Sequence, residues 1–291
     1  MTYAPGPRTP PRSCLVVPGH NERRYEKAAT AGADEVVFDL EDAVPASEKP
    51  RARELVARLI NTPQWRRRRV AVRVNPLWSA EHADDVAALA TTEHIGLSVV
   101  LPKVEGPADV RMILEGFGRE FPVQALIESP RGLLNALAIA DADGVSALII
   151  GYADLAARLG RRAIPGRPDD WSVHRETVLA AARAAGVDAI DGPFFGLRDA
   201  HGLTEATITT RSAGFDGKWA IHPDQVAVIN DVFAATAAER AWAHEVLDAL
   251  HSEGAAAVGG WMVDQAMARQ ARRLLALGSP NDGEDLKEPN R

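Results

Sequence analysis

The 291-residue sequence contains a single cysteine, Cys14, so an intrachain disulfide is impossible. Apolar residues 15–17 follow Cys14 directly. We therefore predict that Cys14 is a small buried side chain rather than a reactive nucleophile.

The sequence also lacks the segments that direct a chain into or across a membrane. No apolar run approaches the roughly 20 residues that a membrane-spanning helix needs. Residues 1–11 are rich in proline and contain no apolar stretch of the signal-peptide kind. We expect a cytoplasmic protein with no membrane partner.

The sequence has fewer basic than acidic residues, with 33 Lys and Arg against 40 Asp and Glu, which gives a net charge of -7. Nucleic-acid binding usually needs a basic surface, so we do not expect a nucleic-acid partner. The one basic cluster, residues 66–69, precedes a predicted strand and is typical of a solvated turn. Glycine-rich phosphate loops of the P-loop and dinucleotide-binding kinds are also missing.

What the sequence does contain is a regular alternation of strand-like and helix-like segments. Helical patterns at 48–60, 83–90, 108–117 and 174–185 fall between short β-branched runs. Such alternation predicts an α/β fold with parallel strands and right-handed crossovers. Eight strands in one chain favour a closed (β/α)₈ TIM barrel. The predicted strands are residues 13–17, 35–40, 70–74, 97–101, 123–127, 147–150, 187–190 and 218–221.

A helical extension follows the predicted barrel. Residues 236–239, Thr-Ala-Ala-Glu, match a capping box that opens a helix over 240–250. A glycine-rich stretch at 254–260 then precedes another helix and is either a plain connector or the hinge of a movable lid. We predict a catalytic barrel of residues 12–235, an extension or lid of residues 236–278, and disordered tails of residues 1–11 and 279–291.

Two acidic residues at the ends of neighbouring strands are candidate metal ligands. Glu128 follows the strand at 123–127, and Asp154 follows the strand at 147–150. One strand–helix–strand unit, with a helix over 131–142, places both at the edge where barrel active sites lie. One or two carboxylates with waters and substrate oxygens suit Mg²⁺, or alternatively Mn²⁺. Two unrelated strand-end acids are the other interpretation.

Arg73 ends a further predicted strand and could bind the substrate of such a metal site. An α-keto acid can chelate a divalent ion, and a guanidinium could hold a carboxylate or a developing thioester enolate. Alternatively, Arg73 forms a rim ion pair with Asp39 or Glu41, and both roles can hold together. The cluster of Asp39, Glu41 and Asp42 is a second candidate metal site, ranked below the first.

Lys103 and His222 also follow predicted strands. Lys103 could form a Schiff base, as in metal-free aldolases, but its acidic surroundings favour an ion-paired ammonium. His222 could act as a base or as a structural hydrogen-bonding group.

These motifs, in this order, resemble the HpcH/HpaI aldolase family, and within it the citrate lyase beta subunit and malyl-CoA (citramalyl-CoA) lyase branch. The resemblance extends from about residue 12 to residue 277 and is specific as a set, although each motif alone is weak. The matching stretches are residues 12–13, 17–19, 39–44, 72–75, 101–105, 127–129, 151–155, 191–193, 217–226 and 262–264.

The resemblance implies a barrel that assembles as a homotrimer or homohexamer and cleaves or forms a carbon–carbon bond beside a coenzyme A thioester. It implies that Glu128 and Asp154 bind Mg²⁺ and that Arg73 steadies the enolate. Asp264 would act as a general acid or base over a neighbouring subunit's site, which favours the lid interpretation. Implied near substrate or coenzyme A are Val16, Lys27, Ala153, Ile221 and His222, with Arg12, Asp39, Glu41, Asp42 and Lys103 as supporting residues.

Two positions depart from the family pattern. Asn21 stands where malyl-CoA lyases tend to have arginine, which removes one expected contact with a coenzyme A phosphate. Tyr152 is bulkier than the usual residue beside the metal ligand, which bears on the keto acid that fits.

The leading hypothesis is a stand-alone lyase for malyl-, citramalyl- or citryl-CoA that gives acetyl-CoA or propionyl-CoA and an α-keto acid. The alternatives are a citrate lyase beta subunit that acts with an acyl-carrier partner, and a malate synthase or thioesterase activity. A non-enzymatic protein that binds coenzyme A or keto acids is the remaining alternative.

Overall fold

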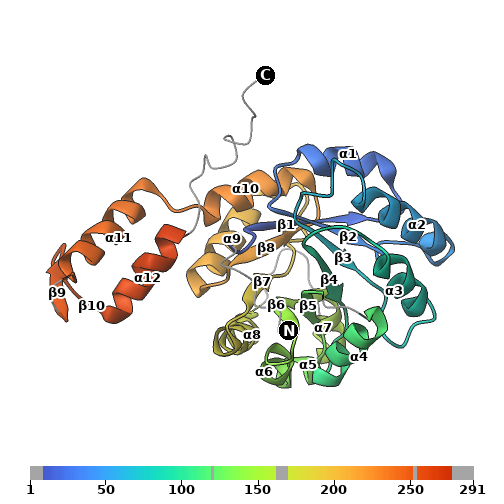
Figure 1. The fold of residues 1–291 in the computed structure, drawn as a ribbon. Helices are drawn as coiled ribbons and strands as arrows, with labels where there is room; N and C mark the ends of the chain where they lie inside the picture. Colours follow the sequence, from blue (N-terminus) through green and yellow to red (C-terminus); the bar gives the residue numbers. More distant parts are fainter. Residues whose placement is uncertain (1–8, 119–120, 162–169, 252–253, 277–291) are drawn as a thin grey trace.

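Eight parallel strands close into a barrel in sequence order, with β8 pairing back to β1 (Figure 1). The structure is a computed structural model that describes residues 9–118, 121–161, 170–251 and 254–276. The predicted (β/α)₈ barrel is confirmed. The strands are β1 Ser13–Pro18, β2 Glu35–Asp39, β3 Val70–Arg73, β4 Leu97–Leu101, β5 Val123–Ile127, β6 Val145–Ile150, β7 Asp188–Asp191 and β8 Gly217–Ala220.

Helices surround the barrel and bury the outer faces of its strands (Figure 1). None of the helices in the described ranges is long and apolar enough to cross a bilayer. A short 3₁₀ turn, η1 Ala46–Glu48, leads into α2. The helices are α1 Glu22–Thr30, α2 Lys49–Ile60, α3 His82–Ala90, α4 Pro107–Phe117, α5 Pro130–Leu134, α6 Ala136–Ala140, α7 Tyr152–Leu159, α8 Ser172–Ala185, α9 Ala200–Ala213 and α10 Pro223–Phe233.

The single helix expected over 131–142 is two short helices, α5 and α6. They meet at Asn135, whose backbone angles of φ −98° and ψ 8° leave the helical region. The Asn135 side chain donates a hydrogen bond to the carbonyl of Glu105 at 2.7 Å. This bond ties the junction of α5 and α6 to the loop after β4, so a tertiary contact holds Asn135 where the helix breaks.

The barrel interior is apolar in the middle and polar at both ends. Because successive strand residues face opposite sides, inward positions recur every second residue. The fully buried Cys14 lies in the apolar middle, as predicted, together with Val37, Leu126 and Trp219. Polar chemistry is therefore confined to the two ends of the barrel.

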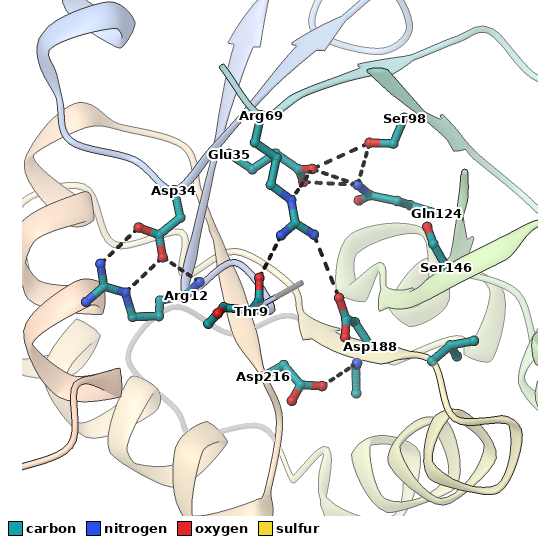
Figure 2. A network of polar contacts seen from close by, with 12 residues as sticks. Thr9, Arg12, Asp34, Glu35, Arg69, Ser98, Gln124, Ser146, Asp188 and Asp216 are labelled. Atoms are coloured by element: carbon teal, nitrogen blue, oxygen red, sulfur yellow. Dashed lines mark hydrogen bonds and ion pairs between the residues drawn. The ribbon is translucent and has the colours of Figure 1, made fainter. Parts of the chain in front are cut away.

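A buried polar network closes the end where the strands begin (Figure 2). Glu35 is 1% exposed and accepts hydrogen bonds from Arg69 Nε at 3.2 Å and from Gln124 Nε2 at 3.0 Å. Arg69 Nη2 also lies 3.8 Å from Asp188. Residues 66–68 form an exposed turn as predicted, whereas Arg69 is an ion-paired part of the barrel base.

The C-terminal extension packs as α11 Ala237–Ala249, β9 Ala255–Val258, β10 Trp261–Asp264 and α12 Gln265–Ala276, and projects to one side of the barrel (Figure 1). The predicted capping box is present, since Thr236 Oγ1 accepts from the Glu239 backbone at 3.2 Å and Glu239 accepts from the Thr236 backbone at 2.7 Å. The predicted boundary between the barrel domain and the extension, at residues 235 and 236, stays a prediction.

The glycine-rich stretch is an antiparallel hairpin rather than an irregular connector. Val258 pairs with Trp261, so Gly259 and Gly260 form a two-residue turn. Both glycines have positive φ, 57° and 83°. Two-residue hairpin turns favour residues that adopt positive φ, which accounts for the glycine pair.

Candidate active site

Arg73 and Asp39 form a two-point ion pair at the end of the barrel where the strands finish. They are register partners at the ends of β3 and β2. Arg73 Nε donates to Asp39 Oδ1 at 2.7 Å, and Nη2 donates to Oδ2 at 2.6 Å. Burial alone would raise the pKa of Asp39, but the charge and hydrogen bonds of Arg73 hold that pKa below its usual value. The guanidinium is therefore fixed in plane and position.

Glu41 lies between two cationic side chains. Its Oε2 lies 3.0 Å from Arg73 Nη1, and its Oε1 accepts a hydrogen bond from Lys103 Nζ at 2.5 Å. Burial raises the pKa of Glu41 in spite of these cations. The neighbouring Asp42 has a side chain that is 58% exposed, with Oδ2 3.6 Å from Lys103 Nζ. We call the end of the barrel where the strands finish the barrel mouth. Glu41 lies inside this mouth, and Asp42 lies at its rim.

Lys103 is the one non-glycine residue of the described chain with positive φ, at 56°. This left-handed conformation is uncommon for a side chain of this kind. It lets the Lys103 backbone N–H donate to Glu128 Oε1 at 2.7 Å while Nζ reaches Glu41. Burial would lower the pKa of Lys103, but the hydrogen bond and charge of Glu41 raise it. Lys103 is therefore a protonated ammonium, which disfavours the Schiff-base alternative.

Glu128 lies in surroundings that disfavour its ionised form. The residue is 3% exposed. Burial, and then the charges of Glu41 and Asp154, raise the pKa of Glu128 to about 8. A Cβ at Gly151 would lie 2.7 Å from Glu128 Cβ and 2.8 Å from Oε2, so the end of β6 approaches this carboxylate as closely as backbone can. Asp154 follows in the first turn of α7.

Glu128 and Asp154 suit a divalent cation of the Mg²⁺ type. Within the described ranges no three His, Cys, Asp or Glu side chains gather in a metal-binding group. The protein would therefore contribute two carboxylates, with water and substrate oxygens as the other ligands, which is a common arrangement for Mg²⁺. A cation there would compensate the charge that raises the pKa of Glu128.

Two further residues support the mouth and were not predicted from the sequence. The ring centroid of Trp219, on β8, lies 5.7 Å from the Arg73 guanidinium carbon. Lys49 Nζ donates to the Leu40 carbonyl at 2.9 Å and to Asn75 Oδ1 at 2.5 Å, which ties the loop after β2 to the loop after β3. Trp219 stands two positions before Ile221 and faces the barrel interior. Because inward positions recur every second residue along a strand, the sequence pattern could have predicted this orientation.

Several residues implied near substrate lie at or toward the same mouth. Val16 is a half-buried β1 residue that packs on the apolar middle layer. Ala153 is exposed in the first turn of α7. Ile221 follows β8, and its backbone N–H donates to Gln225 Oε1 at 2.8 Å. His222 caps α10, with Nδ1 accepting a hydrogen bond from the Asp224 backbone N–H at 3.3 Å, and its side chain is 45% exposed.

Three implied residues lie away from Glu128 within one chain. Arg12 precedes β1 and pairs with Asp34 through Nε at 2.8 Å and Nη2 at 2.9 Å, at the opposite end of the barrel (Figure 2). Lys27 is exposed in the last turn of α1. Asp264 ends β10 in the extension, and its Oδ1 accepts from the Ala266 backbone at 2.8 Å, which caps α12 (Figure 1).

A hollow of about 520 Å³ lies beside the loop between β1 and α1. Two arginines give it a basic lining, and Asn21 is part of it. The lining residues are His20, Asn21, Glu22, Arg23 and Arg51.

Comparison with known proteins gives consistent similarities over most of the chain. The family HpcH/HpaI aldolase/citrate lyase matches residues 12–223. The (3S)-malyl-CoA thioesterase of Cereibacter sphaeroides (strain ATCC 17025) is 36% identical over 274 residues, which cover 92% of this chain and 94% of the relative. The L-malyl-CoA/beta-methylmalyl-CoA lyase of the same strain is 33% identical over 303 aligned residues, with 93% and 95% covered.

A solved structure shows the same fold. The crystal structure of the protein CitE from Mycobacterium tuberculosis, in complex with magnesium, acetoacetate and coenzyme A, matches with a TM-score of 0.78 and 36% sequence identity. The match covers 91% of this chain and 97% of that chain. The likeness therefore includes the barrel mouth.

Proposed function

The chain belongs to the HpcH/HpaI aldolase/citrate lyase family and is an enzyme of the carbon–carbon lyase class, and we propose that it acts on a β-hydroxyacyl-CoA. The substrate would be of the malyl-, citramalyl- or citryl-CoA type, and the products an α-keto acid and acetyl-CoA or propionyl-CoA. The observation that carries the proposal is the mouth itself. There, the acids Glu128 and Asp154 share one barrel end with an Arg73 that Asp39 holds in place.

Glu128 and Asp154 would hold Mg²⁺, with Mn²⁺ as a substitute. When bound, the ion would polarise the oxygens of the substrate's keto or hydroxyl group. The raised pKa of Glu128 supports this role because burial and the charges of Glu41 and Asp154 disfavour a bare carboxylate, which a cation would stabilise. The similarity to a relative crystallised with magnesium supports it independently.

Arg73 would stabilise the charge that forms when the carbon–carbon bond breaks. Cleavage removes the hydroxyl proton and leaves an enolate on the thioester fragment. The hydrogen bonds to Asp39 and the ion pair with Glu41 engage three of the five guanidinium N–H groups, so the other two could reach the thioester oxygen. A donor held in place before the reaction stabilises developing charge without reorganisation.

Coenzyme A would bind along the first βα loop. The hollow there presents Arg23 and Arg51, and the exposed Lys27 lies on the helix that follows. Arginine and lysine are the usual partners of phosphate groups. The relative crystallised with coenzyme A supports coenzyme A as a ligand.

Asp264 would serve the active site of a neighbouring subunit in a homotrimer or homohexamer. The extension carries Asp264 outside its own barrel (Figure 1). On the same hairpin, Trp261 and Met262 are 75% and 73% exposed, and large apolar side chains of this kind often mark a protein–protein contact. Placed over an adjacent mouth, Asp264 would protonate the enolate carbon.

Thioester hydrolysis is the second candidate function, favoured by the 36% identity to a malyl-CoA thioesterase. Product analysis separates the two. A lyase acting on malyl-, citramalyl- or citryl-CoA releases keto acid and an intact acyl-CoA, and EDTA stops it. A thioesterase releases free coenzyme A and the hydroxy acid. Free coenzyme A without any keto acid, across this panel, would replace the lyase proposal with the hydrolase.

A further inference from the structure

Tyr152 lies two residues before Asp154, yet its side chain points away from the barrel mouth. Its hydroxyl donates a hydrogen bond to Oδ1 of Asp191, the last residue of β7. The ring packs on Trp171 with centroids 5.0 Å apart, and a Cβ at Gly192 would lie 2.7 Å from its Cδ2. Because Ile190 faces the barrel interior, Asp191 faces the helix layer. The bulk of Tyr152 therefore fills space behind β7 and not the keto-acid pocket.

Asp191 is a rigid, ionised anchor for the Tyr152 hydroxyl. The residue is 1% exposed, and its Oδ2 accepts from Lys218 Nζ at 2.5 Å and from Thr210 Oγ1 at 2.6 Å. Burial would raise the pKa of Asp191, but Lys218 lowers it. Burial and then the charge of Asp191 raise the pKa of Tyr152, so the hydroxyl keeps its proton and donates. Strands β7 and β8 thus hold the first residue of α7.

Asp154 depends on this helix turn for its position. Its carboxylate makes no hydrogen bond or ion pair with any residue of the described ranges. Gly151, directly before α7, lies against the like-charged Glu128, since a Cβ there would be 2.8 Å from Glu128 Oε2. Two carboxylates stay close to each other only if the backbone segments that carry them are held in place. Ligands held in place before the ion arrives lower the free-energy cost of binding it.

We propose that Tyr152 is a positioning residue for the metal: its hydrogen bond to Asp191 fixes the first turn of α7 so that Asp154 meets Glu128 across the ion. This inference rests on the proposed function, because it takes Glu128 and Asp154 as ligands of one divalent cation. Outer-shell hydrogen bonds made directly to a metal ligand are typically worth about 10- to 100-fold in metal affinity. Tyr152 would act on Asp154 through the backbone of α7, so we expect an effect at the lower end of this range.

The test is a Mn²⁺ titration of the EDTA-treated full-length protein, followed by electron paramagnetic resonance. Tyr152→Phe keeps the ring packed on Trp171 and removes only the hydroxyl. We expect its Kd for Mn²⁺ to rise about 10-fold or more. The matched control is Tyr25→Phe on α1, which loses a buried hydrogen bond from the Tyr25 hydroxyl to the Gly19 carbonyl, and we expect it to keep the wild-type Kd. Thermal midpoints of the metal-free proteins report the general loss of stability in both variants.

Three results would overturn the inference, and they distinguish a wrong positioning role for Tyr152 from a wrong metal site. A wild-type Kd in Tyr152→Phe, with binding that Glu128→Gln abolishes, rejects the positioning role and leaves the proposed function standing. Equal weakening in Tyr25→Phe and Tyr152→Phe shows a global effect and also rejects it. Wild-type protein that binds no Mn²⁺ rejects the proposed metal site and the inference together.

Discussion

Asp39 and Arg73 face each other across β2 and β3, with both guanidinium bonds, 2.7 and 2.6 Å long, ending on one carboxylate. The Arg73 side chain is 11% exposed and that of Asp39 is fully buried. A rim ion pair and a substrate-binding arginine were alternative interpretations of the sequence. The ion pair is present, and a substrate-binding role is compatible with it, because Asp39 fixes the orientation of the Arg73 guanidinium.

Arg73→Lys should therefore be slow even though it keeps the positive charge. A lysine ammonium cannot reproduce the planar two-point contact with Asp39. Loss of one preorganised donor to a developing oxyanion typically costs about 100- to 1,000-fold in kcat, and we expect a fall in this range. Steady-state kinetics on the cleaved hydroxyacyl-CoA provide the measurement.

Arg12→Lys is the matched control, because Arg12 makes an equivalent two-point pair with Asp34 at the other end of the barrel. We expect it to lower the thermal midpoint and to leave kcat near the wild-type value. A near-normal kcat in Arg73→Lys would reduce Arg73 to general charge attraction.

Lys103 should form no covalent adduct with a keto acid. Its ammonium is held by Glu41 and its pKa is raised, so the neutral amine that a Schiff base requires is scarce. Incubation with pyruvate or oxaloacetate and borohydride, followed by peptide mass spectrometry, should show an unmodified Lys103 and undiminished activity. A reduced adduct on Lys103 would indicate a metal-free aldolase mechanism instead.

Asp188, in the base network of Figure 2, should make the protein less stable as pH rises. Burial, and then the charge of Asp216, raise the pKa of Asp188 from 3.8 to about 6. A raised folded-state pKa favours the protonated form, so its stabilisation is full below pH 3.8 and is lost as pH rises through about 6. Urea unfolding between pH 4 and 7 should show this decline, and Asp188→Asn should flatten it.

The control for this pH series is Asp84→Asn, whose side chain is 71% exposed. We expect Asp84→Asn to keep the wild-type pH dependence. An unchanged slope in Asp188→Asn would show that other groups control stability in this range.

Mixed oligomers should reveal whether Asp264 acts on a neighbouring subunit. Asp264→Asn and Glu128→Gln homo-oligomers should each be inactive. After subunit exchange, some sites would combine an intact Asp264 with an intact Glu128, so partial activity should return. Confirmed exchange without recovery, or a monomer in solution, would contradict this assembly.

The hydrophobic pattern of the sequence was enough to predict the barrel, because most of the buried strands are short apolar runs followed by polar residues. Predicted and observed strands differ by no more than two residues at either end, as with 187–190 against β7 Asp188–Asp191. The hairpin at β9 and β10 was missed because its strand Ala255–Val258 is mostly alanine, which has little strand preference.

Part of the site lay beyond the reach of sequence patterns. Arg12 belongs to a matching motif, yet it pairs with Asp34 at the barrel base, since motif order does not say which end a residue faces. The positive φ of Lys103 and the outward direction of Tyr152 depend on the rotation of a loop and a helix against their neighbours. Such orientations are set by tertiary packing and appear only in the folded chain.

The most direct test of the account is the rate of keto-acid release by EDTA-treated protein as Mg²⁺ is added back. We expect no cleavage without metal, saturable recovery in the wild type, and none at any Mg²⁺ concentration in Glu128→Gln or Asp154→Asn, with each variant folded by circular dichroism. Full activity in the metal-free wild type, or normal recovery in either variant, would contradict the central claim that these two carboxylates hold the ion required for carbon–carbon cleavage.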